Sequence, residues 1–199
     1  MKQEEKSRKS REHILSCAFA EFAEQGYAGA SVNTICSSGK ISKGLLYHYY
    51  TDKDTLYLAC VEQCYKELTE YLSVHLDASN ITPDQYFDVR QVYFLANPLH
   101  QKLFCDTVVN PPQHLREELA ACRAEFDHLN DTMLTVILEK ETLAEGITIH
   151  DALRQLRVFE DFVSACLKNA GQEARQVEEH NKLCRQTFKT MLYGLIARS

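Results

Sequence analysis

The side chains best suited to hold a charged partner gather between residues 31 and 53. They carry hydroxyl, ammonium, phenol and imidazole groups, each of which can donate a hydrogen bond to an anion. The chain has no Gly-x-Ser-x-Gly or His-Glu-x-x-His pattern, no glycine-rich phosphate loop and no other recognisable catalytic group, so we expect no enzyme and no cofactor. The donors in this segment are Ser31, Ser42, Lys43, Tyr47, His48 and Lys53.

Cysteine is the second residue type with reactive chemistry, and the chain has eight. Cys60 and Cys64 stand four residues apart on one expected helix face, where they could bind a metal or sense an oxidant. No second close pair completes a four-ligand zinc site, and a free cysteine commonly behaves as a small buried apolar residue. We therefore expect no bound metal, and we retain a thiol-redox or metal switch as an alternative.

The start of the chain, MKQEEKSRKSREHIL, has no apolar core of the kind found in a signal peptide. No run of 18 apolar residues occurs elsewhere, which predicts that no segment spans a membrane. We expect a cytosolic protein whose thiols stay reduced. The net charge of −6 on 199 residues argues against a protein that is basic throughout.

Helical elements must position these side chains, because apolar residues recur every three to four positions over most of the chain. Only four Pro and seven Gly occur, which also argues against many short strands. The pattern predicts an all-α protein with about nine helices. They are expected at about residues 10–23, 32–38, 43–49, 53–72, 83–96, 99–109, 113–141, 148–170 and 172–197.

Two of the shortest helices form a helix-turn-helix pattern in the sequence SVNTICSSGKISKGLLYHYY. Ser31 and Ser42 are suitable N-caps for these helices. Gly44 carries no side chain, so the backbone there can approach a partner closely. The residues expected to face inward are Val32, Ile35, Cys36, Ile41, Leu46 and Tyr49.

The segment from about Arg11 to Leu56 resembles the DNA-binding domain of the TetR family of bacterial repressors. One departure is the turn, which reads Gly39-Lys40-Ile41-Ser42 where the family usually has Ala-Gly-Val-Ser, so that Lys40 adopts a left-handed conformation or the turn differs locally. The matching residues are Phe19, Phe22, Gly26, Tyr27, Ser31, Ile35, the run Ser42–Tyr50, Lys53 and Leu56.

The resemblance implies a role in DNA binding for eight residues. Ser31, Lys53, Tyr47 and His48 are expected at phosphates, which set the register of the complex. Tyr47 could instead be a core aromatic. The residues expected nearest to base edges are Ser42, Lys43, Gly44 and Leu45.

The charge distribution supports a division into a DNA-binding domain over residues 1–56 and a ligand-binding and dimerisation domain over residues 57–199. Residues 1–57 hold eight Lys and Arg against seven Asp and Glu, whereas the remainder holds 14 against 21. The first residues are either an arm that touches DNA or a solvated, disordered tail. The cations of this arm are Lys2, Lys6, Arg8, Lys9 and Arg11.

The last two helices carry broad apolar stripes. These stripes either form a four-helix interface in a homodimer, as the resemblance implies, or pack inward. A dimer would place two recognition helices on the half-sites of a palindromic DNA operator. The expected interface residues are Phe159, Phe162, Val163, Cys166, Phe188, Met191, Leu192 and Leu195.

The resemblance also implies a pocket for a small, partly apolar effector among the middle helices. Aromatic residues at helical spacing are as readily explained as plain core. The candidates are Tyr86, Tyr93, Phe94, His100, Phe104, Phe126 and His128.

These observations predict a ligand-responsive DNA-binding transcriptional regulator, in which the effector releases a repressor from its operator. The first alternative is a thiol-redox or metal-sensing regulator on the same scaffold. The second is a helical enzyme or partner-binding module in which the helix-turn-helix pattern is coincidental.

Overall fold

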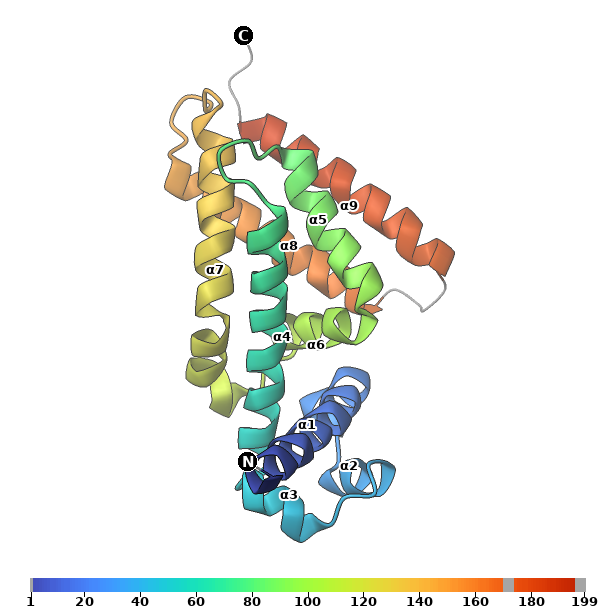
Figure 1. Ribbon diagram of the computed structural model, residues 1–199. Helices are drawn as coiled ribbons and strands as arrows, with labels where there is room; N and C mark the ends of the chain where they lie inside the picture. Colours follow the sequence, from blue (N-terminus) through green and yellow to red (C-terminus); the bar gives the residue numbers. More distant parts are fainter. Residues whose placement is uncertain (1, 170–173, 196–199) are drawn as a thin grey trace. The chain divides into compact units, whose positions relative to one another are not determined.

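The computed structural model describes residues 2–169 and 174–195, and within these ranges every regular element is a helix (Figure 1). The all-α prediction is therefore confirmed for the part of the chain that is described. The helices are α1 (Lys2–Gly29), α2 (Val32–Ser38), α3 (Lys43–Tyr49), α4 (Lys53–His75), α5 (Pro83–Ala96), α6 (Pro98–Val109), the 3-10 turn η1 (Gln113–Leu115), α7 (Arg116–Glu139), α8 (Ile149–Asn169) and α9 (Ala174–Leu195).

Local caps explain why several helices begin where the sequence predicts. The Ser31 hydroxyl accepts a hydrogen bond from Asn33 N at the start of α2, and the Ser42 hydroxyl accepts one from Leu45 N at the start of α3. Asp52 Oδ1 accepts from Thr55 N at 2.7 Å at the start of α4. Each cap satisfies a backbone donor that has no partner inside its own helix.

The chain forms two compact units. Unit 1 comprises Met1–Lys66 and Asn97–Arg123, and unit 2 comprises Glu67–Ala96 and Ala124–Ser199. Because the division falls inside α4 and inside α7, each of these helices contributes residues to both units. The expected functional boundary after residue 56 remains a prediction.

Unit 1 packs α1, α2 and α3 together with the first part of α4, and it adds α6 from later in the chain. Ile14, Ala18 and Phe22 of α1 are fully buried, and α6 packs against α1. The Phe22 ring packs edge-on against Tyr57 of α4 with their centroids 5.0 Å apart. The largest fully buried side chains of this unit are Ile14, Phe22, Ile35, Leu46, Leu56, Tyr57, Tyr65 and Leu103.

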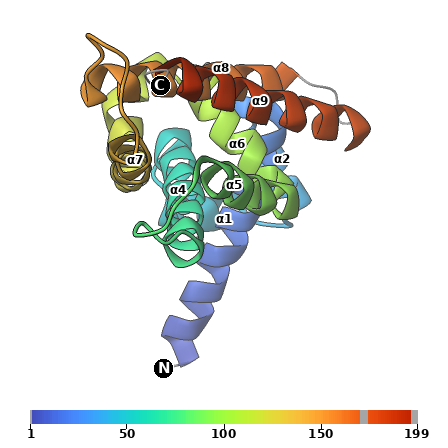
Figure 2. The same cartoon turned by 90° about the horizontal axis from the view of Figure 1, so that it is seen from above.

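Unit 2 places α8 beside α9, as Figure 2 also shows, and packs α9 against α5. Phe188 of α9 is central to this core, with ring centroids 5.8 Å from Tyr86, 6.3 Å from Phe87 and 6.1 Å from Phe159. Ion pairs border the α5–α9 contact, where Arg185 pairs with Asp88 and Lys189 pairs with Asp84. No described helix is long and apolar enough to cross a membrane.

Candidate nucleic-acid interface

Helix α3 presents one buried side and one exposed side. Leu46 is fully buried and Ile41 before the helix is nearly so, so these two side chains lie on the inner side of α3. Leu45 and Tyr47 are large side chains with exposed fractions of 38% and 47%. The residues predicted to face DNA are all exposed here, namely Ser42, Lys43, Gly44, Leu45, Tyr47 and His48.

The aromatic residues at the end of α3 differ from the expected arrangement. Tyr49 is only half-buried, and its hydroxyl lies 2.8 Å from Ser7 Oγ of α1. Tyr50 is the buried aromatic, and its hydroxyl accepts a hydrogen bond from Arg11 Nε at 3.5 Å. Tyr50 therefore provides the anchoring that the sequence assigns to Tyr49.

The turn before α3 contains the departure from the family pattern. Lys40 has φ 52°, which is the left-handed conformation considered for this residue. Gly39 has an ordinary φ of −80°, but a Cβ there would lie 2.6 Å from Ile41 Cδ1 and 2.8 Å from Cys17 Sγ. Close packing therefore leaves no room for a side chain at position 39, so glycine is needed there. The left-handed backbone conformation, which is less favourable for a residue with a side chain, falls on the exposed Lys40 instead.

Lys53 is held at the start of α4 by a cluster that the sequence does not reveal. Its Nζ lies 4.5 Å from the centre of the Tyr27 ring, an arrangement that attracts a cation to an aromatic face. The Tyr27 hydroxyl donates a hydrogen bond to Asp54 Oδ1, and His114 Nε2 lies 3.1 Å from Asp54 Oδ2. Tyr27 follows the Gly26 of the family motif, whereas nothing local in the sequence connects His114 to this cluster.

Ser31 starts α2 at a half-buried position. Its backbone N–H donates to Glu21 Oε1 at 3.0 Å, and its hydroxyl oxygen accepts from Asn33 N. Ser42 has the same N-capping arrangement at α3, so both serines combine a cap with an exposed or half-exposed hydroxyl.

The predicted effector residues are distributed over both units. Tyr86, Tyr93, Phe94 and Phe126 are buried in unit 2, while His128 is exposed there. His100 and Phe104 belong to unit 1 instead, on α6. There the His100 ring lies 4.6 Å from the Phe19 ring, and the Phe104 ring lies 5.3 Å from the Tyr65 ring.

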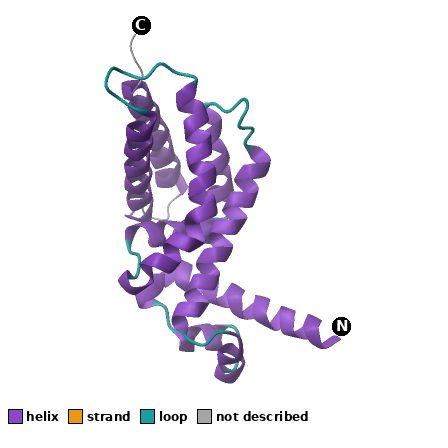
Figure 3. Ribbon diagram, turned by 90° about the vertical axis from the view of Figure 1, so that its left-hand side faces the viewer, coloured by secondary structure: helices purple, strands orange, loops and turns teal. Residues whose placement is uncertain are grey.

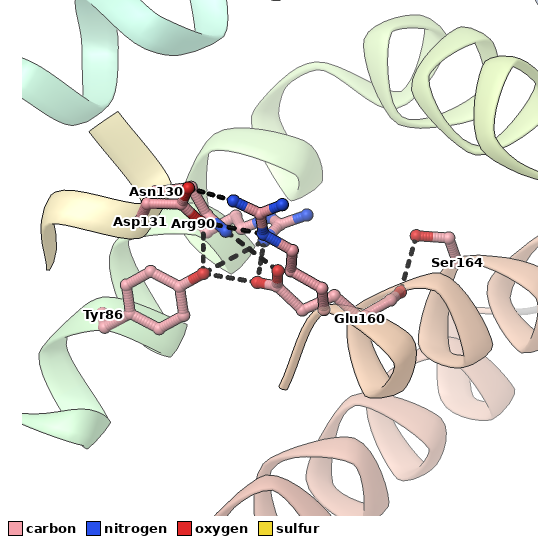
Figure 4. A network of polar contacts seen from close by, with 7 residues as sticks. Tyr86, Arg90, Asn130, Asp131, Glu160 and Ser164 are labelled. Atoms are coloured by element: carbon pink, nitrogen blue, oxygen red, sulfur yellow. Dashed lines mark hydrogen bonds and ion pairs between the residues drawn. The ribbon is translucent and has the colours of Figure 1, made fainter. Parts of the chain in front are cut away.

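A buried polar network joins α5, α7 and α8 within unit 2 (Figure 4). Arg90 NH1 donates to Glu160 Oε1 at 2.7 Å, and both side chains are about 15% exposed. Tyr86 donates to Glu160, and Asn130 Nδ2 donates to Glu160 Oε2 at 2.9 Å. Burial is the main reason that the pKa of Tyr86 stands well above its ordinary value, so the phenol stays protonated as a donor.

The predicted dimer residues separate into buried and accessible sets. Phe159, Phe188 and Leu192 are buried in unit 2. Phe162 is 62% exposed, while Val163, Cys166 and Met191 are half-buried. The side chain of Leu195 lies outside the described residues. Other exposed apolar side chains of α8 and α9 are Val158, Leu183 and Tyr193.

The two cysteines proposed as an alternative switch are inaccessible. Cys60 is 0% and Cys64 is 1% exposed, and burial raises the pKa of the Cys60 thiol far above its ordinary value. A reactive cysteine needs exposure and a lowered pKa. Among the described residues there is no group of three or more His, Cys, Asp or Glu side chains placed to hold a metal ion.

Comparison with known proteins supports the assignment of the N-terminal segment. Residues 14–60 match the family model for bacterial regulatory proteins of the tetR family. The chain is 26% identical over 123 residues to the IcaR negative transcriptional regulator of the biofilm operon icaADBC from Staphylococcus epidermidis, covering 62% of this chain and 64% of that protein. It is 34% identical over 85 residues to the repressor SCO4008 from Streptomyces coelicolor, covering 43% and 42%.

The structural comparison extends the likeness in fold to nearly the whole chain. A TetR family transcriptional regulator from Chloroflexus aurantiacus aligns over 96% of this chain and 95% of its own, with 18% identity and a TM-score of 0.70. The curated relatives are matched over less than two thirds of their own length. The resemblance to the TetR family is confirmed, and the matched proteins are transcriptional regulators.

Proposed function

We propose that this protein is a transcriptional repressor that binds a palindromic DNA operator as a homodimer and releases it when a small, partly apolar effector binds. It is proposed to act in the bacterial cytosol. The observation that carries the proposal is the exposed side of α3, where polar groups and two large uncovered side chains, Leu45 and Tyr47, share one surface. This surface belongs to the segment that matches the TetR family model.

The chemistry of this side of α3 suits the major groove. A Cβ added at Gly44 would meet no described atom within 4 Å outside the backbone of its own helix, so a base edge can approach this position closely. The Lys43 ammonium can donate to guanine O6 and N7, and the Leu45 side chain can contact a thymine methyl group. Tyr47 and His48, one turn further along the helix, can donate to backbone phosphates.

Lys53 is the proposed phosphate contact outside α3. The Tyr27 ring holds its ammonium in a defined place, so less side-chain entropy is lost when a phosphate binds. The start of α4 adds the partial positive charge of a helix N-terminus. Asp52 occupies the cap, and the hydrogen bond from the Thr55 backbone N–H is the main reason that the pKa of Asp52 is lowered.

Two substitutions test this assignment in a footprint and a binding titration against DNA upstream of the protein's own gene. Lys53→Ala is expected to weaken binding to all sequences and to reduce the slope of log K against log salt by about 0.9 for each lost phosphate contact. Lys43→Ala is expected to change base preference at one position of each half-site, by about 1–3 kcal/mol. Wild-type protein without salt-dependent, sequence-selective binding would overturn the proposal.

The homodimer is proposed to form through the exposed apolar side chains of α8 and α9. Val158 and Phe162 lie one helical turn apart on α8, and both are more than 60% exposed. Leu183 and Tyr193 on α9 are also exposed at 60% and 63%. Large apolar side chains that leave water on association supply most of the free energy of a stable dimer.

The effector is proposed to bind in unit 2, where Tyr86, Tyr93, Phe94 and Phe126 supply apolar surface. The Arg90–Glu160 network offers polar groups beside them, since Arg90 also lies 5.3 Å from the centre of the Phe126 ring. An effector releases DNA only if it binds the two states of the dimer with different affinity. By linkage, operator DNA must then weaken effector binding by the same factor.

A further inference from the structure

The first turns of α1 form a part of unit 1 that the proposed base and phosphate contacts do not use. Figures 2 and 3 show these turns continuing as a helix past the body formed by α2 and α3. Each described side chain from Gln3 to Lys9 is exposed. The structure therefore has a helix where the sequence allowed either an arm or a disordered tail.

Two of the contacts that fix α1 against the helix-turn-helix lie at the two ends of α3. His13 Nε2 lies 2.8 Å from the Gly39 carbonyl oxygen at the turn before α3. Ser7 Oγ lies 2.8 Å from the Tyr49 hydroxyl at the end of α3. Because both ends of the recognition element are attached to α1, the exposed turns have a fixed direction relative to α3.

A shallow, open groove lies between the start of α1 and the end of α3. His48, one of its lining residues, is also a proposed phosphate contact, so the groove continues the phosphate-binding side of α3. Its volume is about 720 Å³. The lining residues are Gln3, Glu4, Ser7, Arg8, Arg11, His48 and Tyr49.

We propose that this groove binds the DNA backbone beyond each half-site, with Arg8 as its phosphate ligand. The inference rests on the proposed function and extends the DNA contacts past α3. Base reading is expected at the start of α3 and backbone contact at its end, so a groove beside His48 faces the phosphates that follow. The helix from Lys2 to His13 is about 16 Å long, enough to follow several phosphates of one strand.

Arg8 is free to exchange its present partner for a phosphate. Its NH1 donates to Glu12 Oε1 at 2.7 Å, but the two side chains are 63% and 58% exposed. Exposed ion pairs of this kind contribute little free energy, and a guanidinium binds a phosphate through two parallel hydrogen bonds. The preformed helix spares the cost of ordering a flexible arm on binding.

Lys9 supplies a matched control that lines a different groove on the same helix. It pairs with Glu5 at 2.8 Å, again one turn away, and the side chains are 66% and 57% exposed. This second groove is lined by Glu5, Lys6, Lys9, Ser10 and His13 and includes no residue of α3. Arg8→Gln and Lys9→Gln therefore remove one positive charge each from equally exposed pairs.

The experiment compares two operator duplexes, one cut at the outer edge of each half-site and one extended by half a helical turn on each side. Wild-type protein is expected to bind the extended duplex more tightly. Arg8→Gln should lose about fivefold on the extended duplex, with a salt slope lower by about 0.9 per subunit, and should bind the short duplex unchanged. Arg8→Lys should retain most of the affinity, and Lys9→Gln should match wild type on both duplexes.

The outcomes separate this inference from the function on which it rests. Equal losses for Arg8→Gln and Lys9→Gln, or the same Arg8→Gln loss on both duplexes, would overturn the groove as a flanking-backbone site. So would a wild-type protein that binds both duplexes equally. A wild-type protein that binds neither duplex selectively overturns the proposed function itself.

Discussion

Gly26 shows how one residue sets the course of the chain in unit 1. It has φ 67° and ψ 173°, a backbone region that is essentially open only to glycine. The break lets the backbone N–H of Tyr27 donate to Asp106 Oδ2 of α6 at 3.4 Å. A Cβ at Gly26 would lie 3.1 Å from both carboxylate oxygens of Asp106, so the position excludes side chains for two reasons.

Gly26→Ala is therefore expected to lower the free energy of unfolding by about 2–3 kcal/mol, because it combines a strained backbone with a contact to a buried carboxylate. Gly29→Ala is the control, since a Cβ there meets only Gln25 Cβ at 3.4 Å. We expect that variant to remain within about 0.5 kcal/mol of wild type. Urea unfolding followed by circular dichroism measures both, and equal effects would contradict the assignment.

Among the elements, the start of α4 is joined to α1 and η1 through Tyr27. The Tyr27 hydroxyl donates to Asp54 of α4 and lies 3.3 Å from His114 Nε2 of η1. Burial is the largest cause that raises the pKa of Tyr27 to about 12, and the hydrogen bond to Asp54 adds to it. The protonated phenol thus stabilises the contact that positions Lys53.

This pKa has a consequence for stability at alkaline pH. Between the ordinary value of 10.0 and about 12, the phenol is protonated in the folded chain and ionised in the unfolded chain. Stability must therefore fall as the pH rises through this window. Thermal unfolding between pH 9 and pH 12 is expected to show a steeper loss for wild type than for Tyr27→Phe, which keeps the ring beneath Lys53. Parallel curves would argue against a protonated Tyr27 hydroxyl as the cause.

For the whole molecule, the proposed dimer depends on exposed apolar side chains of α8 and α9. Phe162→Glu would place a charge inside that interface, where it cannot be solvated. Val92→Glu on α5 is the control, because Val92 is 56% exposed and Phe162 is 62% exposed. We expect Phe162→Glu to shift the protein to monomer in sedimentation equilibrium and to weaken operator binding at least tenfold. A dimer that survives this substitution would place the interface elsewhere.

Much of the fold follows from local sequence, because the interactions that start and stop a helix are local. Ser31 and Ser42 cap α2 and α3 as expected, and Thr82 caps α5 by accepting from Gln85 N at 3.2 Å. The matching motif in the N-terminal segment likewise indicated the exposed side of α3. These features need only a few neighbouring residues, so their pattern survives in the linear sequence.

Contacts between distant residues could not be predicted in the same way. The sequence pattern assigned the inward position to Tyr49, whereas Tyr50, which contacts Arg11 of α1, is the buried one. The sequence also cannot distinguish an apolar stripe that faces a partner from one that faces inward. In the structure, Phe188 and Leu192 are buried in the core of unit 2. Burial depends on which helices meet, and helical periodicity contains no information on that.

The sequence by itself predicted most of the helices, several of their caps, the left-handed option at Lys40 and the resemblance of the N-terminal segment to the TetR family. Only the tertiary structure placed His114 at Asp54, assigned His100 to unit 1 and revealed the groove between Arg8 and His48. The physical reason is the separation along the chain of the residues that interact. Caps and periodicity act within one or two turns of a helix, whereas each of these arrangements depends on side chains that are tens of residues apart and meet only after the helices pack.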